Sequence, residues 1–232
     1  MMPKKLIITI DGPSGAGKSS VGDLLAARLG YIHLSTGAIY RAIGWKAHTQ
    51  GIDLSDSSAL ERVIQASSIE LQRLEGGSVS VLLDGENVTE TILTNEVGML
   101  ASAVSAIPQV RQALLSLQRR AGQEGGVILD GRDTGTVVFP DADLKFYLDA
   151  SVEERARRRY AQLRGQGIES DLEQLVQDIT KRDHDDSTRA TAPLRKAEDA
   201  VYIDSSTLSQ EAVVEKMLEE LQKKSLTITN IS

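Results

Sequence analysis

The stretch Gly12-Pro13-Ser14-Gly15-Ala16-Gly17-Lys18-Ser19 decides the fold, because it fits the pattern G-x-x-x-x-G-K-[ST] at every fixed position. Residues 6–10 before it are apolar and β-branched, as in a buried parallel strand, and residues 20–29 carry apolar side chains at helical spacing. In a strand–turn–helix unit of this kind, backbone N–H groups and the positive end of the helix face an anion. The stretch therefore predicts a phosphate-binding loop for a nucleoside triphosphate.

The motif predicts a specific role for individual residues of the loop. Lys18 is expected to reach the β- and γ-phosphates, and the Ser19 hydroxyl is expected to hold Mg²⁺. The alternative, an ordinary glycine-rich turn, is disfavoured because the fixed positions and both flanks agree. With ATP as the nucleotide, the expected contacts are Gly12, Ser14, Gly15, Ala16, Gly17, Lys18, Ser19 and Ser20.

Composition narrows the class of protein. The chain has 232 residues, enough for one α/β domain with excursions from it. Its formal net charge of −7 argues against general nucleic-acid binding, and without cysteine it can form neither disulfides nor thiolate metal sites. No apolar run approaches the roughly 18 residues of a membrane span. We expect a cytoplasmic enzyme that binds neither nucleic acid nor membrane; without a coiled-coil repeat, we expect a monomer.

Strand and helix patterns alternate after the loop. Further buried strands are predicted at 31–34, 127–129, 144–148 and 201–203. Helices are predicted at 57–67, 94–105 and 209–223 and from residues 38, 108 and 151 onward. Between them, residues 69–73, 79–83 and 87–89 alternate with period two around a Gly76-Gly77 break and an Asp84-Gly85 turn. These patterns predict a three-layer α/β fold with a central parallel sheet and a small inserted antiparallel sheet.

Two features near strand ends bear on the site. Asp130, Gly131, Arg132 and Asp133 follow strand 127–129 directly, and ligands collect at the carboxyl ends of parallel strands. His33 lies between apolar neighbours in strand 31–34, so we expect a packed or partly exposed histidine without a catalytic role.

Residues 151–196 hold eight arginines in an acidic chain. Ser151 and Glu154 form a capping box, and the spacing predicts solvated pairs of Glu153 with Arg157 and of Glu154 with Arg158. Arg155 and Arg159 lie four residues apart with no acid four residues before either one. Two like charges on one helical face repel, and a shared phosphate would reverse that repulsion.

The acids among residues 181–189 could neutralise the arginines of that segment locally. Residues 165–167, Gly-Gln-Gly, predict a flexible tip between two helices. An arginine-bearing segment of this kind indicates a helical lid that closes over the phosphate loop and excludes water.

Cationic residues outside the lid indicate a second anionic substrate. Arg41, Arg111 and Arg132 come from separate segments, each at a predicted helix or strand end. No N-K-x-D sequence occurs, so guanine recognition of the GTPase type is unsupported. Each arginine alone fits a surface charge, but together they favour transfer to a small anionic acceptor.

The sequence resembles the bacterial-type cytidylate kinases, a branch of the nucleoside monophosphate kinases with a P-loop NTPase fold. The matching stretches run in order over nearly the whole chain: ITIDGPSGAGKSS at 8–20, STGAIYRA at 35–42, ILDGRDTGTVVFPDAD at 128–143, KFYLDASVEERARRR at 145–159 and RATAPL at 189–194. Adenylate, guanylate and thymidylate kinases lack the third of these. The predicted insert also fits, since this family enlarges its monophosphate-binding domain with a small antiparallel sheet.

The resemblance implies transfer of the γ-phosphoryl group of ATP to CMP or dCMP with Mg²⁺. It implies that Ser19 and, through water, Asp130 hold the metal. It places Arg41 and Arg132 on phosphate, and Arg182 and Asp186 on the sugar. The full substrate set it implies is Thr36, Tyr40, Arg41, Ser102, Arg111, Arg132, Asp133, Arg182, Asp186 and Arg189, with Ser102, Arg111 and Asp133 on the cytosine. The transition-state charge would fall to Lys18, Arg155, Arg159, Arg182 and Arg189.

The resemblance also divides the chain. Residues 1–35, 112–150 and 197–224 form the core, 36–111 the CMP-binding domain with its insert, 151–196 the lid and 225–232 a flexible tail. Ser35 departs from the family, which usually has Asp there, and this leaves the local water or metal contacts open. Two alternatives remain: a related kinase for UMP, AMP or a non-nucleotide acceptor, and a regulatory ATPase without a small acceptor.

Overall fold

A computed structural model describes residues 5–73 and 79–229. Its central sheet has the strand order β2-β6-β1-β7-β8, and all neighbouring strands are parallel. Every strand predicted for this sheet is present: β1 (Ile7–Asp11), β2 (Ile32–Ser35), β6 (Val127–Gly131), β7 (Leu144–Asp149) and β8 (Val201–Asp204). The predicted α/β class with a central parallel sheet is confirmed.

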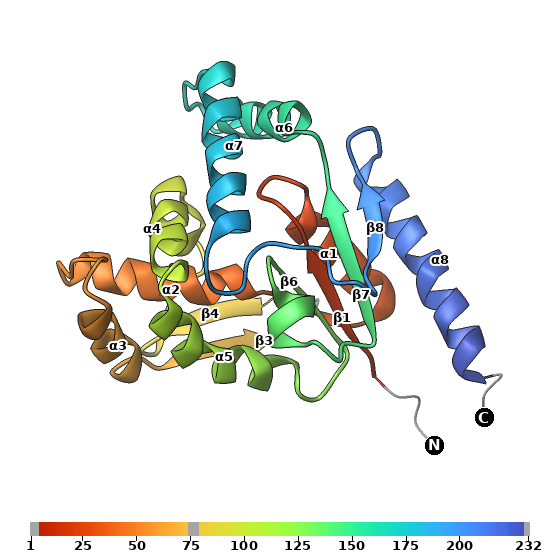
Figure 1. The fold of residues 1–232 in the computed structure, drawn as a ribbon, viewed down its shortest axis with the longest axis horizontal. Coiled ribbons are helices and arrows are strands. Elements are labelled where there is room, and N and C mark those ends of the chain that lie inside the picture. Colours follow the sequence, from red (N-terminus) through yellow and green to blue (C-terminus); the bar gives the residue numbers. More distant parts are fainter. Residues whose placement is uncertain (1–4, 74–78, 230–232) are drawn as a thin grey trace.

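Helices cover both faces of this sheet and make three layers (Figure 1). On one face α1 (Lys18–Leu29) and α8 (Gln210–Thr229) pack against the fully buried side chains of Ile8, Ile10 and Phe146. On the other face Leu34, Val127 and Leu129 pack against the end of α5 (Pro108–Gly122) and the inserted strands. The continuous apolar runs in the sequence thus correspond to strands buried on both sides.

The inserted sheet has the predicted antiparallel order β3 (Ile69–Arg73), β4 (Val79–Leu83) and β5 (Glu86–Asn87). Asp84 and Gly85 turn the chain with φ of 53° and 85°, the two positive angles of a type I′ hairpin. The third strand ends at Asn87, earlier than predicted, because the Thr89 side-chain hydroxyl replaces a backbone acceptor for the Val81 N–H (2.9 Å). Gly76-Gly77 lies outside the described residues.

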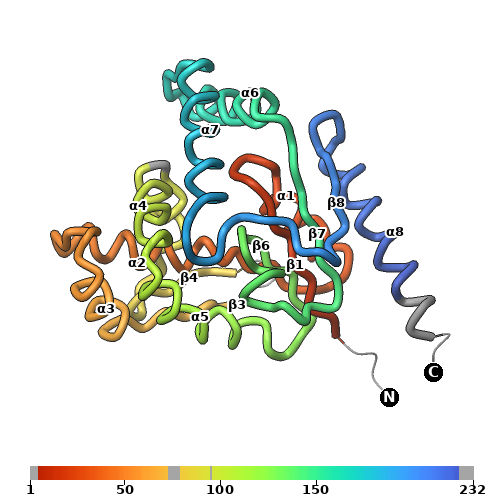
Figure 2. The backbone as a smooth tube through the Cα atoms, viewed as in Figure 1, coloured from red at the N-terminus to blue at the C-terminus, as the bar shows by residue number. Residues whose placement is uncertain are grey.

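Four helices and a short 3-10 turn accompany this insert: α2 (Thr36–Thr49), α3 (Ser57–Gln65), α4 (Asn95–Ser105), α5 and η1 (Thr91–Leu93). Ile39, Ile43 and Val104 form part of their own hydrophobic cluster, separate from the core between β1 and α8. The tube in Figure 2 shows these helices to one side of the central sheet.

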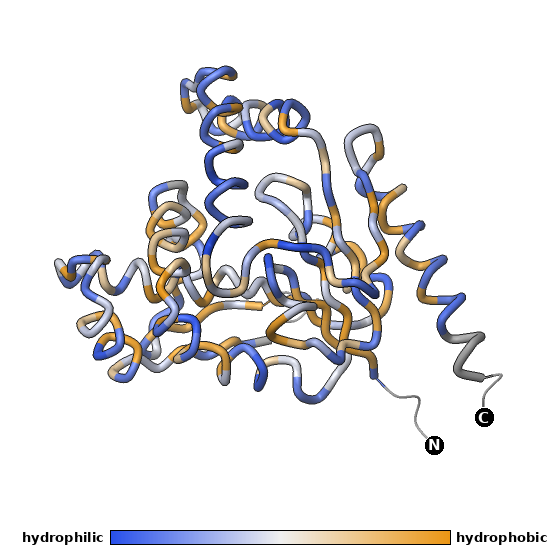
Figure 3. Tube along the Cα trace, in the orientation of Figure 1, coloured by the Kyte–Doolittle hydropathy of each residue, from blue (hydrophilic) through white to orange (hydrophobic). Residues whose placement is uncertain are grey.

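The predicted lid consists of α6 (Val152–Gly165) and α7 (Leu172–Thr188), which rise above the loop and are mostly hydrophilic in Figure 3. The Ser151 hydroxyl accepts the Glu154 N–H (3.2 Å), which confirms the N-cap half of the predicted capping box; the Ser151 N–H donates to the Ser206 hydroxyl (2.9 Å) and not to Glu154. Glu154 pairs with Arg158 as expected (3.0 Å), but Arg157 also pairs with Glu154 (2.9 Å), three residues before it, and not with the predicted partner Glu153, four residues before it.

Two segments differ from the predicted outline. A single π-helical turn, η2 (Thr134–Val138), follows Asp133 where no helix was expected. α8 continues to Thr229, past the boundary expected at 224, and residues 230–232 lie outside the described ones. Among the described helices, none combines the length and apolarity that a bilayer crossing requires.

Phe146→Ala should lower the free energy of unfolding by about 3–5 kcal/mol, because it leaves a large cavity under β7. Phe146 is fully buried in the cluster between the sheet, α1 and α8. Urea unfolding measures the change. Met99→Ala, at a position 68% exposed, is the control and should change the free energy by less than about 0.5 kcal/mol. Equal effects would contradict the assigned core.

Candidate active site

The phosphate-binding loop joins β1 to α1 at the carboxyl end of the sheet (Figure 1). Gly12 has φ of 150°, and a Cβ there would lie 1.9 Å from the Leu148 carbonyl oxygen, so only glycine lets the loop leave β1 against β7. Gly17 stands at the N-cap of α1 with φ of 93°. Ser14, Gly15 and Ala16 complete the loop, and Ser19 and Ser20 lie in the first turn of α1.

Lys18 lies inside this loop and is buried. Its Nζ donates to the Pro13 carbonyl (2.7 Å). Burial lowers the pKa of Lys18, and the neighbouring charges of Arg132 and Arg182 lower it further. A negative charge placed beside Lys18 would reverse this destabilisation of its ammonium form.

Asp130, in β6, forms hydrogen bonds with residues of two other predicted site segments, one in α1 and one in α2. The Ser19 hydroxyl donates to Asp130 Oδ2 (2.7 Å), and the Thr36 hydroxyl donates to the Asp130 carbonyl (2.9 Å). Burial acts to raise the pKa of Asp130, but the hydrogen bond and charge of His33, with Lys18 and Ser19, outweigh it and hold the pKa below its usual range. Asp130 therefore stays a carboxylate.

His33 is packed, as predicted, but it also contacts the site. Its Nδ1 lies 2.7 Å from Asp23 Oδ1, and its Nε2 lies 3.3 Å from Asp130 Oδ2. Burial acts to lower the pKa of His33, yet the two carboxylates outweigh it and raise the pKa to about 9. The apolar neighbours of His33 in sequence gave no sign of this contact.

Four cations around the loop form no ion pair within the described residues: Lys18, Arg41, Arg159 and Arg182. They come from α1, α2, α6 and α7. Burial lowers the pKa of Arg41, and the charges of Arg132 and of Arg159 on α6 lower it further, so these cations lie close enough to repel one another. Such a group of repelling cations is suited to a polyphosphate.

The side chain of Arg182 contains a hydrogen-bond donor that no acceptor satisfies within the described residues. Its Nε is buried and has no hydrogen-bond partner within the described residues. Burial and the charge of Arg132 lower the pKa of Arg182 to about 10. Arg159 is more exposed, and its Nη1 donates to the Gln162 side chain, also on α6.

A second group of arginines is paired with acids. Arg132 Nε contacts Asp186 Oδ2 (2.9 Å), which joins the end of β6 to α7. Asp133 accepts hydrogen bonds from Arg111 and, at 3.3 Å, from Arg189. The Arg111 guanidinium also lies 5.4 Å from the centre of the Tyr40 ring.

Three of these residues, Tyr40, Arg111 and Asp133, line a small cavity. Its volume is about 60 Å³, and its walls include Tyr40, Arg111, Gln118, Asp133 and Ala192. Arginine N–H groups and an aspartate carboxylate at one cavity offer the donor and acceptor that a carbonyl and an exocyclic amine require.

The remaining predicted site residues lie nearby, but their side chains do not converge on a single point. Arg41 Nη1 donates to the carbonyls of Ile92 (2.8 Å) and Thr94 (3.1 Å) at the start of α4. Ser102 lies one turn before Ser105, whose carbonyl accepts from Arg111 (3.1 Å). The Ser102 hydroxyl itself makes no hydrogen bond within the described part of the chain.

Arg155 is buried and bonded to protein atoms. Its Nη1 and Nη2 contact both oxygens of Asp183 (3.1 and 2.6 Å), and Nη1 also donates to the Ser14 carbonyl (3.0 Å). Its Nε donates to the Ala150 carbonyl (2.9 Å). A direct phosphate contact of Arg155, as predicted, would require these bonds to rearrange.

Asp11 is a site residue that sequence reasoning missed. Its carboxylate is buried and accepts the N–H groups of Thr134 (2.8 Å) and Gly135 (2.7 Å), the first residues of η2. Burial outweighs these bonds and raises the pKa of Asp11 to about 6. Its position at the end of β1, directly before the loop, was the available signal.

The residues present fit a magnesium ion held mainly by substrate. Mg²⁺ prefers oxygen ligands and is usually bound by one or two protein oxygens together with phosphates. Ser19 and the ionised Asp130 supply such oxygens, 2.7 Å apart. Within the described residues no group of three or more His, Cys, Asp or Glu is placed to hold a metal ion.

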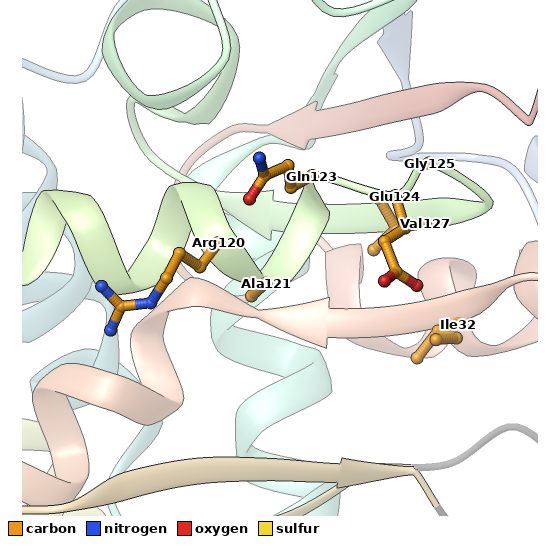
Figure 4. A pocket seen from close by; sticks show the side chains of 7 residues that line it. All are labelled: Ile32, Arg120, Ala121, Gln123, Glu124, Gly125 and Val127. Atoms are coloured by element: carbon orange, nitrogen blue, oxygen red, sulfur yellow. The ribbon is translucent and has the colours of Figure 1, made fainter.

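A larger cavity lies away from this chemistry. It has a volume of about 470 Å³ and is lined by Ile32, Arg120, Ala121, Gln123, Glu124, Gly125 and Val127 (Figure 4). Ile32 and Val127 begin β2 and β6, so the cavity lies at the amino ends of the strands, opposite the loop. It is no part of the candidate site.

Comparisons with known proteins cover nearly the whole chain. A model of the cytidylate kinase family matches residues 8–223. The chain is 51% identical over 212 residues to a cytidylate kinase of Geobacter sp. strain M21, covering 91% of each chain. It is 48% identical over 220 residues to a cytidylate kinase of Caldicellulosiruptor bescii, covering 95% of this chain and 97% of that one.

A solved structure supports the fold alone. A gluconokinase from Sinorhizobium meliloti superposes with a TM-score of 0.51 at 16% identity, over 99% of this chain and 98% of that one.

Asp11→Asn should lower the free energy of unfolding by about 1–3 kcal/mol, because the amide nitrogen would face one of two backbone N–H donors. Urea unfolding at neutral pH measures the loss. The control is Asp53→Asn, at an exposed carboxylate that also accepts a backbone N–H, from Ser55 (2.8 Å). A loss no larger than that of the control would contradict the role of Asp11.

The pH dependence of this difference has a definite sign. The pKa of about 6 in the folded protein lies above the 3.8 of an aspartate in water, so the stability that protonated Asp11 contributes is lost as the pH rises between these two values. The stability difference between wild type and Asp11→Asn should therefore shrink over that range. A difference that grows with pH would contradict the raised pKa.

Proposed function

The chain belongs to the cytidylate kinase family and is a nucleoside monophosphate kinase, and on that premise we propose that it transfers the γ-phosphoryl group of ATP to CMP or dCMP, giving ADP and the diphosphate. The observation that carries this proposal is the group of Lys18, Arg41, Arg159 and Arg182, cations without carboxylate partners in the described structure. Two phosphate-bearing substrates would supply the missing negative charge.

On the donor side, the loop residues 12–20 hold the triphosphate. Its negative charge favours the ammonium form of Lys18, whose pKa burial and cations otherwise lower. The Ser19 hydroxyl and, through water, the Asp130 carboxylate would hold Mg²⁺. The metal ion would supply positive charge to the β- and γ-phosphate oxygens.

On the acceptor side, Arg111 donates to the cytosine carbonyl and Asp133 accepts from its amine, with Thr36, Tyr40 and Ser102 beside them. Support comes from the pairing of Arg111 with Asp133 at a small cavity. Arg41 and Arg132 hold the acceptor phosphate. The sugar meets Arg182 and Asp186, and Arg189 lies between the base and the phosphates.

Transfer itself needs no general base. The acceptor phosphate oxygen is already anionic, so it bonds to the γ-phosphorus as the bond to the leaving ADP oxygen breaks. Positioning and charge neutralisation then supply the rate enhancement. Lys18, Arg159, Arg182 and Arg189 neutralise the spread charge, and Arg155 adds its charge from behind the loop at the Ser14 carbonyl.

The proposal extends to the setting of the enzyme. Its partners are small-molecule nucleotides, and we propose a cytoplasmic monomer that binds neither nucleic acid nor membrane. The net charge of −7 supports the absence of a general nucleic-acid surface.

An assay of ADP release with each monophosphate in turn tests the reaction. CMP and dCMP should give the fastest release, because the Arg111–Asp133 pair suits cytosine. Lys18→Ala should abolish turnover while CMP binding stays measurable by calorimetry, since Lys18 contacts only the donor. Fastest release with UMP or AMP would contradict the acceptor, ADP release indifferent to monophosphates would indicate an ATPase, and near-normal turnover of Lys18→Ala would contradict the donor site.

Asp133→Asn and Arg111→Lys should raise the KM for CMP by about tenfold and the KM for ATP by much less, as for the loss of one hydrogen bond to substrate. Conservative changes are chosen because deleting one partner of a buried ion pair costs about 3–5 kcal/mol of stability. Steady-state kinetics with each substrate varied measures both constants. Equal increases for CMP and ATP would show that the pair is structural.

A further inference from the structure

Arg158 connects three parts of the molecule that bear on the donor site. From α6, its Nη2 donates to the Ser205 carbonyl (2.6 Å), and its Nη1 lies 3.2 Å from the Ser205 hydroxyl. The same Nη1 reaches the Ala16 carbonyl at 3.4 Å. Figure 2 shows the start of α6 between the phosphate loop and the turn that joins β8 to α8. The side chain is 32% exposed, so it is not the solvated residue predicted from spacing.

The contact of Arg158 with the Ala16 carbonyl matters because the carbonyl groups of the phosphate loop need hydrogen-bond donors. A loop that turns its N–H groups toward a phosphate must turn carbonyls away from it, and those carbonyls need donors of their own. Lys18 supplies one to Pro13 (2.7 Å), and Arg155 supplies one to Ser14 (3.0 Å). Near the Ala16 carbonyl lie Arg158 Nη1 at 3.4 Å and the Ser205 hydroxyl at 3.2 Å, and the single hydrogen of that hydroxyl is shared with the Asp149 carbonyl at 2.9 Å.

Two further contacts fix Arg158 in this place. Glu154, one turn earlier on α6, accepts from its Nε (3.0 Å). Ser205 is itself held, since its N–H donates to the Asp149 carbonyl (2.8 Å) at the end of β7. The guanidinium thus lies between two anchored groups, and a Cβ on Gly17 would lie 3.8 Å from its Nη1.

Arg157 provides an internal comparison. It also pairs with Glu154 (2.9 Å), but its side chain is 63% exposed and has no contact with the loop or with Ser205 among the described residues. The two neighbours therefore share helix, charge and acidic partner, and differ in the contacts with Ala16 and Ser205.

We infer that Arg158 is a positioning residue for the donor nucleotide: it holds the carbonyl side of the phosphate loop against the β8–α8 turn, so that the loop N–H groups stay turned toward the triphosphate. The inference rests on the proposed function in one respect, that the loop binds the triphosphate of ATP. Arg158 acts through the loop and touches no reacting atom.

The experiment compares Arg158→Ala with Arg157→Ala in the full chain. The dissociation constant for ATP is measured by calorimetry, and KM and kcat are measured for ATP and CMP. Arg158→Ala should raise the dissociation constant and the KM for ATP about tenfold, as for one lost charge-assisted contact, with the KM for CMP unchanged. Arg157→Ala should change each constant by less than about twofold, as for a surface ion pair.

Arg158→Lys should restore part of the ATP affinity, because a lysine ammonium can reach one of the two carbonyls but lacks the guanidinium fork. Ser205→Ala keeps the arginine and removes the hydroxyl near Ala16. It should weaken ATP binding in the same direction and keeps the inference testable if Arg158→Ala does not fold.

Two results would overturn the inference: ATP constants of Arg158→Ala that match those of Arg157→Ala, or equal losses for ATP and CMP. If Arg158→Ala does not fold, unchanged ATP binding in both Arg158→Lys and Ser205→Ala overturns it instead. Failure of the proposed function looks different, because the wild-type protein itself would then bind no ATP.

Discussion

The buried carboxylate of Asp11 fixes the spacing between the two halves of the site. Burying a charge costs several kcal/mol unless hydrogen bonds replace water, and Asp11 accepts two backbone N–H groups of η2 in return. Asp11 directly precedes the phosphate loop, and η2 directly follows Asp133. One carboxylate at the end of β1 thus holds together the phosphate-binding loop and the segment that follows Asp133, the donor and acceptor sides of the proposed site.

The cationic side chains around Asp11 fall into two groups, those with acidic partners and those without. Arg111, Arg132, Arg155 and Arg189 have acidic partners, which orient them and join β6, α5 and the lid helices. Lys18, Arg41, Arg159 and Arg182 have none among the described residues, and in the proposed site they bind phosphate. In the proposed site, the paired arginines form part of the walls, and the unpaired ones would supply the affinity for anions.

Local patterns predicted most of the fold, because strand and helix periods depend on neighbours in sequence. The phosphate loop, the parallel strands and the Asp84-Gly85 hairpin could all be predicted from such local patterns. Contacts between residues far apart in the sequence could not be predicted from these local patterns. Arg158 meets Ser205, 47 residues away, and His33 meets Asp130 because β2 pairs with β6 in one register. The π turn at η2 depends on Asp11, 123 residues from Thr134.

The unpaired cations also govern how the protein responds to its solvent. Repulsion among them is relieved by any multivalent anion that enters, whether or not it is a substrate. A solute that binds only the folded state stabilises it in proportion to the logarithm of its concentration. In the proposed site, phosphate or sulfate from a buffer would compete with the substrates as well as act as a salt, so a melting temperature or Michaelis constant should be given with the buffer anion stated.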